Sequence, residues 1–519
     1  MKRAVLQSPE KRTRRVAQQW TYLLRSVFGA RRRVFGTCSW TVLALALVLI
    51  LVGGSATRAL AEEPSTYTVQ TFENWVKRYA DTKPDFKPGD VLTAKDVERM
   101  RPFVPPGYLE RLNFPGFKAQ IIEVIPHTPA SSYLNCTEKY ASQVRLRSDG
   151  AIMNYTCGQP FPNETLNVSD PMAGYKAAWN YTYRYLYFGF YDLSVDTGLV
   201  RLGYNMGGGA TNFVAGSPPP GNYLVDLPTW KTRLPTEAEA RGDYGGAPRV
   251  ERYLTLFYAR VPFSHLADLD GKAQPLPGAD KIEQENLTYF VTPFDIRGTA
   301  FIIWRYLEDA DKGDPYRADD SWAYIPNLRR VRRISAEVKS DSLLGTDITI
   351  DDFDGFNDRV LNWNWKFLGW KDTLEINDPG NHYVRYFGPD NIVPDDQWSV
   401  KKMAVTLRTP KDPRHPYSAV INFWAADAWS PGYQLTFDRK GKLWKVIEWE
   451  YKYSETFKPG FWAETMNGAH AVIWWHLSAI DVQNNRATVF RQQGPVMERY
   501  SPALLKALFD PDALESIHR

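Results

Sequence analysis

The sequence lacks the short motifs that mark the best-known catalytic, metal and cofactor sites. It has no H-E-x-x-H zinc motif, phosphate-binding loop, dinucleotide fingerprint or nucleophile elbow. Gly207-Gly-Gly-Ala is a lone flexible turn. The acidic run from Asp347 to Gly355 fails the EF-hand spacing, which needs a ligand at every second position and a later glutamate. We therefore expect no catalytic residue, no metal and no cofactor, with a surface calcium site at the acidic run as the alternative.

Histidine is also scarce, with seven residues scattered over 519 positions. His470 and His476 flank an apolar Val-Ile-Trp-Trp run. We expect these two histidines in a strand or in the core rather than as metal ligands.

Positive charge is missing from most of the chain once its first 61 residues are set aside. Residues 1–61 hold 11 of the 63 Lys and Arg residues but one of the 59 Asp and Glu residues, so residues 62–519 carry a net negative charge. Nucleic-acid binding therefore loses its compositional support.

Residues 1–61 have the order of a bacterial secretory signal. Basic residues precede an apolar run from Val42 to Val52, and Ala59-Leu60-Ala61 follows. This order predicts cleavage near Ala61 and a periplasmic protein, with association to the outer membrane left open. A retained membrane anchor is the alternative, because the uncharged stretch 36–57 is long enough to span a bilayer. Arg32-Arg33-Val-Phe also resembles a twin-arginine export signal.

Cysteine is nearly absent, with three residues in the whole chain. Cys38 precedes the apolar run and cannot be a lipid-anchoring cysteine at the end of the signal. Cys136 and Cys157 remain after cleavage, and an even number in an oxidising compartment predicts a disulfide. Between them we expect a hairpin that turns at Ser148-Asp149-Gly150. Two free cysteines are the alternative.

Short alternating runs separated by Gly, Pro, Asn and Asp dominate the chain from about residue 119. This pattern predicts a mainly β (α+β) protein with a large antiparallel sheet. The clearest expected strands lie at 181–188, 252–259, 362–367, 433–438 and 443–451. The last two form a hairpin around Arg439-Lys-Gly-Lys.

Four segments follow from this pattern. They are the signal peptide at 1–61, a helical and irregular segment at 62–115, a single large β-rich domain at 116–505 and a C-terminal tail at 506–519. Thr93 is the expected cap of a helix in the second segment, and Ser501 caps a short amphipathic helix near the end.

The stretch 320–356 combines aromatic, basic and acidic residues more densely than any other. It contains Arg329, Arg330, Arg332 and Arg333, followed by Asp347, Asp351, Asp352 and Asp354. One interpretation is a strand with a solvated basic face. The other pairs the arginines with the carboxylates inside a curved sheet, because an unpaired buried charge is very costly. With a negative mature chain we favour the second, with ion pairs among Arg329, Arg333, Asp347, Asp351 and Asp352.

Aromatic residues are abundant, at 14% with 18 tryptophans. Trp363, Trp365 and Phe367 share one face of an expected strand, and polar residues share the other. A sheet with aromatic faces and a few fixed charges suits an amphiphile with an apolar body and a polar head. The candidate ligand-binding residues are Trp322 and Tyr324, facing a cavity or core, Arg330 and Arg332 toward its rim, and Trp363 and Trp365.

Five sequence blocks carry a resemblance to a known family. They are Gly158-Gln-Pro-Phe-Pro, the block from Asp170 to Asn180, that from Thr292 to Ala300, that from Trp322 to Ile334, and that from Gly345 to Phe353. In this order they resemble a bacterial exported family, domain of unknown function 1329, which is itself similar to outer-membrane lipoprotein-sorting proteins. The resemblance covers about residues 85–505.

The last block also resembles the wider lipoprotein-carrier superfamily. That resemblance implies a strongly curved sheet or half-open β-barrel with a few helices as a lid over a hydrophobic cavity. It implies a periplasmic carrier or transporter accessory for a lipid or other hydrophobic molecule, with no catalytic residues to transfer. The implied partners are an inner-membrane transporter of the resistance-nodulation-division type and an outer-membrane barrel protein.

Two other functions remain open. An envelope hydrolase acting on glycans or lipids would use paired carboxylates such as Asp347 and Asp351. A structural partner in an envelope assembly would need a large exposed apolar patch.

Overall fold

The computed structural model describes residues 64–185, 199–210, 225–226, 231–232, 250–334, 340–376, 380, 386–387, 392–453, 456, 472–484, 486–498 and 501–515. The expected signal at 1–61 lies outside the described residues, as do His470 and Cys38. The residues from Glu63 to Arg519 form one compact unit.

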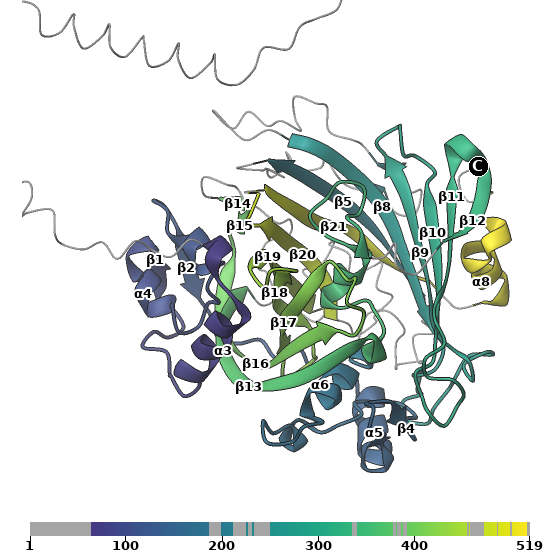
Figure 1. Cartoon of the computed structure of the whole chain (residues 1–519), viewed down its shortest axis with the longest axis horizontal. Helices are drawn as coiled ribbons and strands as arrows, with labels where there is room; N and C mark the ends of the chain where they lie inside the picture. The colour runs from purple at the N-terminus through teal and green to yellow at the C-terminus, as the bar shows by residue number, and fades with distance from the viewer. Residues whose placement is uncertain are drawn as a thin grey trace, which may run out of the picture. The chain divides into compact units, whose positions relative to one another are not determined.

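A single sheet of fifteen strands dominates the described part of the chain (Figure 1). Its strands are β1 (Val91–Thr93), β2 (Lys118–Ile121), β5 (Leu199–Ala210), β8 (Val250–Pro262), β9 (Ile282–Thr292), β10 (Ala300–Tyr306), β11 (Asp320–Ile325), β12 (Arg330–Ile334), β13 (Trp363–Ile376), β16 (Gln397–Pro410), β17 (Tyr417–Ala425), β18 (Pro431–Asp438), β19 (Leu443–Tyr453), β20 (Val472–Asp481) and β21 (Arg486–Glu498). Three small two-stranded ladders are β3 (Arg145–Leu146) with β4 (Ile152–Met153), β6 (Val225–Asp226) with β7 (Lys231–Thr232), and β14 (Tyr386–Phe387) with β15 (Val393–Pro394).

The strand order is β1-β2-β16-β17-β18-β19-β20-β21-β5-β8-β9-β10-β11-β12, and β13 pairs with β16 off this path. Neighbours in the main sheet are antiparallel except β2 and β16, which are parallel, so the sheet is mixed. Among the described residues no pairing joins the end strands β1 and β12, so no closed barrel is present. The mainly β prediction is confirmed, with one parallel pair added to the expected antiparallel sheet.

Helices are few and short. The α-helices are α3 (Val69–Arg78), α4 (Val97–Met100), α5 (Ser131–Tyr140), α6 (Ala173–Thr182) and α8 (Pro502–Phe509). The 3-10 helices are η1 (Pro64–Thr66), η2 (Ala94–Asp96), η3 (Leu109–Leu112), η4 (Ala141–Gln143), η5 (Asn163–Thr165), η7 (Pro326–Leu328), η9 (Ile350–Gly355), η10 (Val360–Asn362) and η12 (Pro511–Ala513). No helix among the described residues is long and apolar enough to cross a membrane.

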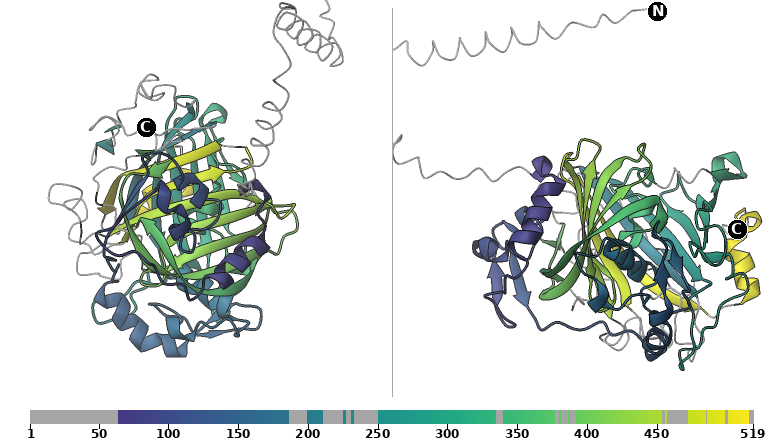
Figure 2. Two further views of the ribbon diagram at one scale, coloured as in Figure 1. Left: turned by 90° about the vertical axis from the view of Figure 1, so that its left-hand side faces the viewer. Right: turned by 60° about the horizontal axis from the view of Figure 1, so that its bottom comes forward.

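Both faces of the central strands are covered. Along β19, Val446 packs in a core cluster with Phe72 of α3, whereas its neighbours Ile447 and Trp449 pack in a second cluster with Leu256 of β8. The purple N-terminal elements lie over the green strands in the left view of Figure 2. Polar residues in these strands are therefore buried on either face.

Two further clusters hold α6 and α8 against the sheet. Trp179 of α6 packs with Trp363 and Trp365 of β13. Phe509 of α8 lies in a cluster with Ile302 of β10, and the Trp304 Nε1–H donates to the Phe509 carbonyl at 3.0 Å.

The disulfide, two hairpins and two helix caps that were expected from local sequence patterns are present in the structure. Cys136 and Cys157 form the expected disulfide, and β3 and β4 form the expected hairpin between them. Ser501 accepts a hydrogen bond from the Leu504 N–H and caps α8, and Thr93 caps η2. β18 and β19 form the expected hairpin.

The strand expected at 181–188 is wrong where it is described. Residues 173–182 form α6, and 186–188 lie outside the described residues. The alternating pattern that begins at Tyr181 starts inside the last turn of α6. The earlier turns of this helix carry good helix formers such as Ala173, Ala177 and Ala178.

Candidate functional site

A pocket of about 590 Å³ lies between four segments that are far apart in the sequence. These are the loop before β11, residues 340–341, the region of η9 and η10 with the start of β13, and the loop from β16 to β17. Its charged lining consists of Asp319, Asp341, Asp351, Asp358, Asp412, Arg359, Lys411 and Arg414, with His415 beside them. Its apolar lining includes Ala318, Leu361, Trp363, Pro410 and Pro416. The volume falls in the range of small-molecule sites.

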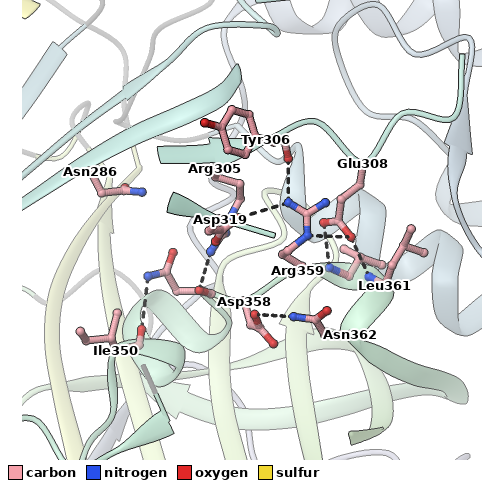
Figure 3. Close-up of polar contacts among 12 residues, drawn as sticks. Asn286, Arg305, Tyr306, Glu308, Asp319, Ile350, Asp358, Arg359, Leu361 and Asn362 are labelled. Carbon is pink, nitrogen blue, oxygen red and sulfur yellow. Dashed lines mark hydrogen bonds and ion pairs between the residues drawn. The ribbon is translucent and has the colours of Figure 1, made fainter. Parts of the chain in front are cut away.

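A buried network of charges supports one side of the pocket (Figure 3). Arg359 Nη1 donates to Asp319 Oδ1 at 3.1 Å and to the Tyr306 carbonyl at 3.0 Å. Arg305 Nε donates to the other Asp319 oxygen at 3.4 Å. The Glu308 carboxylate accepts the backbone N–H groups of Val360 and Leu361, at 3.0 and 2.8 Å (Figure 3). The network fixes the start of η10 to the loop before β11.

Electrostatic balance keeps Arg359 charged in this buried position. Burial acts to lower its pKa, but the carboxylates of Glu308 and Asp319 outweigh burial and raise the pKa above its usual value. The charges of the network are thus satisfied by one another, as buried ion pairs require.

Ser340, Asp351 and His415 form a second polar chain on the pocket wall. Ser340 Oγ donates to Asp351 Oδ2 at 2.8 Å, and His415 Nε2 lies 3.3 Å from Ser340 Oγ. The Tyr417 N–H donates to His415 Nδ1 at 3.0 Å, so the neutral ring carries its proton on Nε2 and donates it to Ser340. A catalytic triad requires the opposite, a histidine that accepts the serine proton. The hydrogen bonds among these three side chains therefore hold them in position and do not activate Ser340 as a nucleophile.

Trp363 is among the residues that line the pocket, but its side chain is buried and held by its neighbours. Its Nε1–H donates to Asp358 Oδ2 at 2.7 Å, and its ring centroid lies 4.8 Å from that of His415. The guanidinium of Arg408 lies 4.4 Å from the centroid of the Trp363 ring, within cation–π range.

The predicted ligand-binding residues do not gather at one place. Trp363 lines the pocket, and Trp365 is buried beside it and donates to the Val360 carbonyl at 3.0 Å. Tyr324 is buried in the cluster beneath α8, and half-buried Trp322 packs against the Trp304 ring. None of these last residues is among those that line the pocket.

The arginines of the stretch 320–356 are exposed on the end strand β12 and in the turn before it. Arg329, Arg330 and Arg332 are exposed, and Arg333 forms an ion pair with Asp320. The expected pairing of Arg329 and Arg333 with the later aspartates is therefore corrected. Because β12 ends the strand path, its arginines reach water without needing a buried partner.

The later aspartates are buried and have other partners. Asp347 accepts from Thr488 Oγ1 at 2.9 Å and lies 3.3 Å from Arg486 Nη1, and burial raises its pKa to about 6. Asp352 accepts from Tyr417 Oη and Gln434 Nε2, both at 2.7 Å. These contacts come from β17, β18 and β21, which sequence spacing does not reveal.

Sequence reasoning missed several charged residues of this region. Arg184 and Asp354 form an ion pair with both side chains 3% exposed, and the Arg184 guanidinium lies 3.8 Å from the centroid of the Tyr181 ring. Arg359 and His415 were not singled out either. The local pattern that could have helped is the aromatic run before Arg184. Such a run indicates that Arg184 is buried, but it does not indicate that Asp354 is its partner.

Solved structures similar to this chain include proteins from the following three bacteria. A candidate outer membrane lipoprotein-sorting protein domain from Vibrio parahaemolyticus is 15% identical, with a TM-score of 0.38, over 67% of this chain and 100% of that chain. A DUF1329 family protein from Desulfovibrio piger is 18% identical, with the same TM-score and coverage. A LolA superfamily protein from Nitrosomonas europaea is 11% identical, with a TM-score of 0.30, over 60% of this chain and 90% of that chain.

No curated protein matches the chain. The family described as protein of unknown function (DUF1329) matches residues 91–198 and 241–515, which is more than half of the sequence. The matched residues include β1 and β2 at one end of the sheet and the whole lining of the pocket. The chain therefore belongs to the DUF1329 family.

Proposed function

We propose that this protein is a non-enzymatic binding or carrier protein of the bacterial periplasm, which holds an amphipathic molecule by its polar head in the pocket. The observation that carries the proposal is a pocket of about 590 Å³ that sets both signs of charge beside apolar lining residues such as Pro410 and Pro416. A pocket of this size, with apolar lining and a few fixed polar groups, suits a small molecule rather than a macromolecule.

The pocket lining holds five aspartates and three basic residues, and we place an anionic group on the head of the ligand at the two exposed cations, Lys411 and Arg414. Arg359 is committed to Asp319 and Glu308 in the buried network. Arg414 is exposed and pairs at 2.8 Å with half-buried Asp412, and Lys411 precedes Asp412 in the sequence. An exposed ion pair is worth little, so a ligand phosphate or carboxylate can replace Asp412 as the partner of Arg414 at small cost.

The hydrolase alternative finds no support in the carboxylate arrangement. Asp351 lines the pocket and accepts from Ser340, whereas Asp347 is held by Thr488 and Arg486 and is not among the lining residues. A pair of catalytic carboxylates has to flank one bond of a substrate. Export to the periplasm and cooperation with an inner-membrane transporter and an outer-membrane barrel protein are further parts of the proposal, and each needs its own test.

A direct binding measurement tests the proposal. We would titrate the purified protein with an anionic lysophospholipid and with the uncharged monoacylglycerol of the same chain length, below their micelle concentrations, by native mass spectrometry. We expect a one-to-one complex with the anionic lipid, weakened at least about tenfold in the double variant Lys411→Gln/Arg414→Gln, since two charge-assisted contacts are lost.

Arg332→Gln is the matched control, because it removes an exposed arginine on β12 that is not among the residues lining the pocket. It should bind as the wild type does. Equal binding by the double variant and the control, or no complex with either lipid, would overturn the proposal.

A further inference from the structure

Two glutamates and a histidine meet inside the sheet, away from the residues that line the pocket. Glu448 and Glu450 alternate along β19, and His476 lies on β20 directly opposite Glu450 in the register. β19 and β20 are neighbours in the sheet (Figure 1). One ligand atom from each residue lies within 4.8 Å of the other two, and His476 Nε2 is 3.7 Å from Glu448 Oε2.

Both carboxylates are buried without a hydrogen-bond partner among the described residues. Glu448 is 1% exposed and Glu450 is fully buried, and all four of their carboxylate oxygens are unsatisfied. Glu308 in the same protein shows the usual arrangement, in which a buried carboxylate accepts two backbone N–H groups. Leaving two carboxylates unsatisfied side by side is costly unless something else compensates them.

The neighbouring charges do not supply that compensation. Glu375 is close enough to Glu448, and Asp396 to Glu450, for their negative charges to act on these carboxyls. Lys452 acts on Glu450 with the opposite sign, but its effect is smaller than that of burial and of the negative charges. Burial and these like charges raise the pKa of both glutamates well above the usual value, so the cluster favours either protons or a cation.

His476 is held in the way that metal-ligating histidines are held. Its Nδ1 lies 2.9 Å from the Phe490 carbonyl, which can only accept, so Nδ1 carries the proton and the lone pair of the neutral ring is on Nε2. Nε2 is the atom that faces Glu448. Ser478 Oγ is 3.1 Å from Nε2 and donates its own hydrogen to the Ile392 carbonyl at 2.6 Å. A backbone carbonyl behind the ring is the common outer support of a metal-bound histidine.

We propose that Glu448, Glu450 and His476 bind one divalent transition-metal ion, with zinc as the probe ion. Two carboxylates neutralise the charge of the ion, and one imidazole selects a transition metal over calcium, which takes oxygen ligands. The ion would link β19 to β20 and satisfy the carboxylate oxygens that have no hydrogen-bond partner in the described part of the chain. This proposal does not depend on the proposed carrier function, because none of the three residues lines the pocket.

Metal analysis of the intact, tag-free protein tests the site. We would strip the protein with a chelator, add zinc, remove the excess and measure zinc per chain. The wild type should retain about one zinc ion per chain, and Glu450→Gln and His476→Gln should retain less than roughly a tenth of that. Cobalt substitution should give the visible absorption of Co²⁺ bound to nitrogen and oxygen in the wild type.

Glu283→Gln is the matched control, because Glu283 is another buried glutamate with an unsatisfied oxygen but stands on β9. It should keep the full amount of zinc. The thermal midpoint of the wild type should rise with zinc concentration, which tests the site even where a variant fails to fold. A wild type that retains no zinc and shows no shift in its thermal midpoint would overturn the proposal and leave the glutamates as a protonated pair. Equal zinc retention in Glu450→Gln and the wild type would also overturn the proposal.

Discussion

Arg359 Nη1 and Asp319 Oδ1 form an ion pair of 3.1 Å, with the two side chains 4% and 0% exposed. Both residues line the pocket, and they join segments 40 positions apart. The ion pair thus lines the pocket and is buried in the protein interior. Changes here should affect folding before they affect binding.

Arg359→Gln should destabilise the protein by about 3–5 kcal/mol, because it removes one of the arginines that neutralise the buried carboxylates of Asp319 and Glu308. Urea unfolding followed by tryptophan fluorescence measures the change in the free energy of unfolding. Arg332→Gln, on the exposed face of β12, should stay within about 0.5 kcal/mol of the wild type. A loss below about 1 kcal/mol in Arg359→Gln would mean that the network is not a structural support.

Gly174 allows α6 to pack closely against the backbone of β13. A Cβ atom at this position would lie 2.4 Å from the Trp365 carbonyl carbon and 2.5 Å from the Lys366 nitrogen. Gly174→Ala should therefore destabilise the protein by about 1–3 kcal/mol through overpacking. This is the net loss, because overpacking against the backbone of β13 outweighs the gain of about 1 kcal/mol that alanine brings to a helix.

Unfolding in urea would again measure the effect, with Gly174→Ser as a graded comparison that should be worse. An alanine variant at least as stable as the wild type would show that α6 can move away from β13 at little cost.

Local patterns in the sequence predicted what depends on local chemistry. The hairpin of β18 and β19, the Ser501 cap and the alternation of Trp363, Asn364 and Trp365 followed from turn residues, capping and strand period. The disulfide followed from the expected oxidising compartment and an even cysteine count.

The partners of charged residues could not be predicted in this way. Arg184 and Asp354 pair across 170 positions, and that choice depends on how the whole sheet folds. Glu448 and Glu450 alternate with aromatic residues as on a strand with one face in water, yet they are buried because the N-terminal segment covers that face. A period of two indicates which residues share a face but not whether a later layer covers it.

The disulfide of Cys136 and Cys157 gives a third prediction. The double variant Cys136→Ala/Cys157→Ala should lose about 3 kcal/mol of stability, because the closed loop of about 20 residues no longer restricts the unfolded chain. Thermal unfolding with and without a reductant measures this. The wild type should lose a similar amount on reduction, and the variant should not respond. Equal midpoints for the oxidised and reduced wild type would show that the bond does not contribute to stability.

His127 is a buried histidine whose ring has no hydrogen-bond partner among the described residues. Its ring stacks on that of Tyr453 with centroids 5.6 Å apart. Burial and the positive charges of Lys401 and Lys452 lower its pKa to about 3, against the opposite effect of Asp427. In the unfolded chain the same group titrates near pH 6.5.

The sign of the pH effect follows from this difference. Between about pH 6.5 and pH 3 the unfolded chain binds a proton at His127 that the folded protein excludes, so stability is lost as the pH falls, by about 1.4 kcal/mol per pH unit. Buried glutamates with raised pKa values, such as Glu375, act in the opposite direction and mask this slope in the wild type. His127→Phe removes the titration and keeps an aromatic ring against Tyr453. Urea unfolding at pH 7.5, 6, 5 and 4 should therefore show the variant gaining on the wild type steadily below pH 6, and parallel curves for the two proteins would contradict a neutral buried His127.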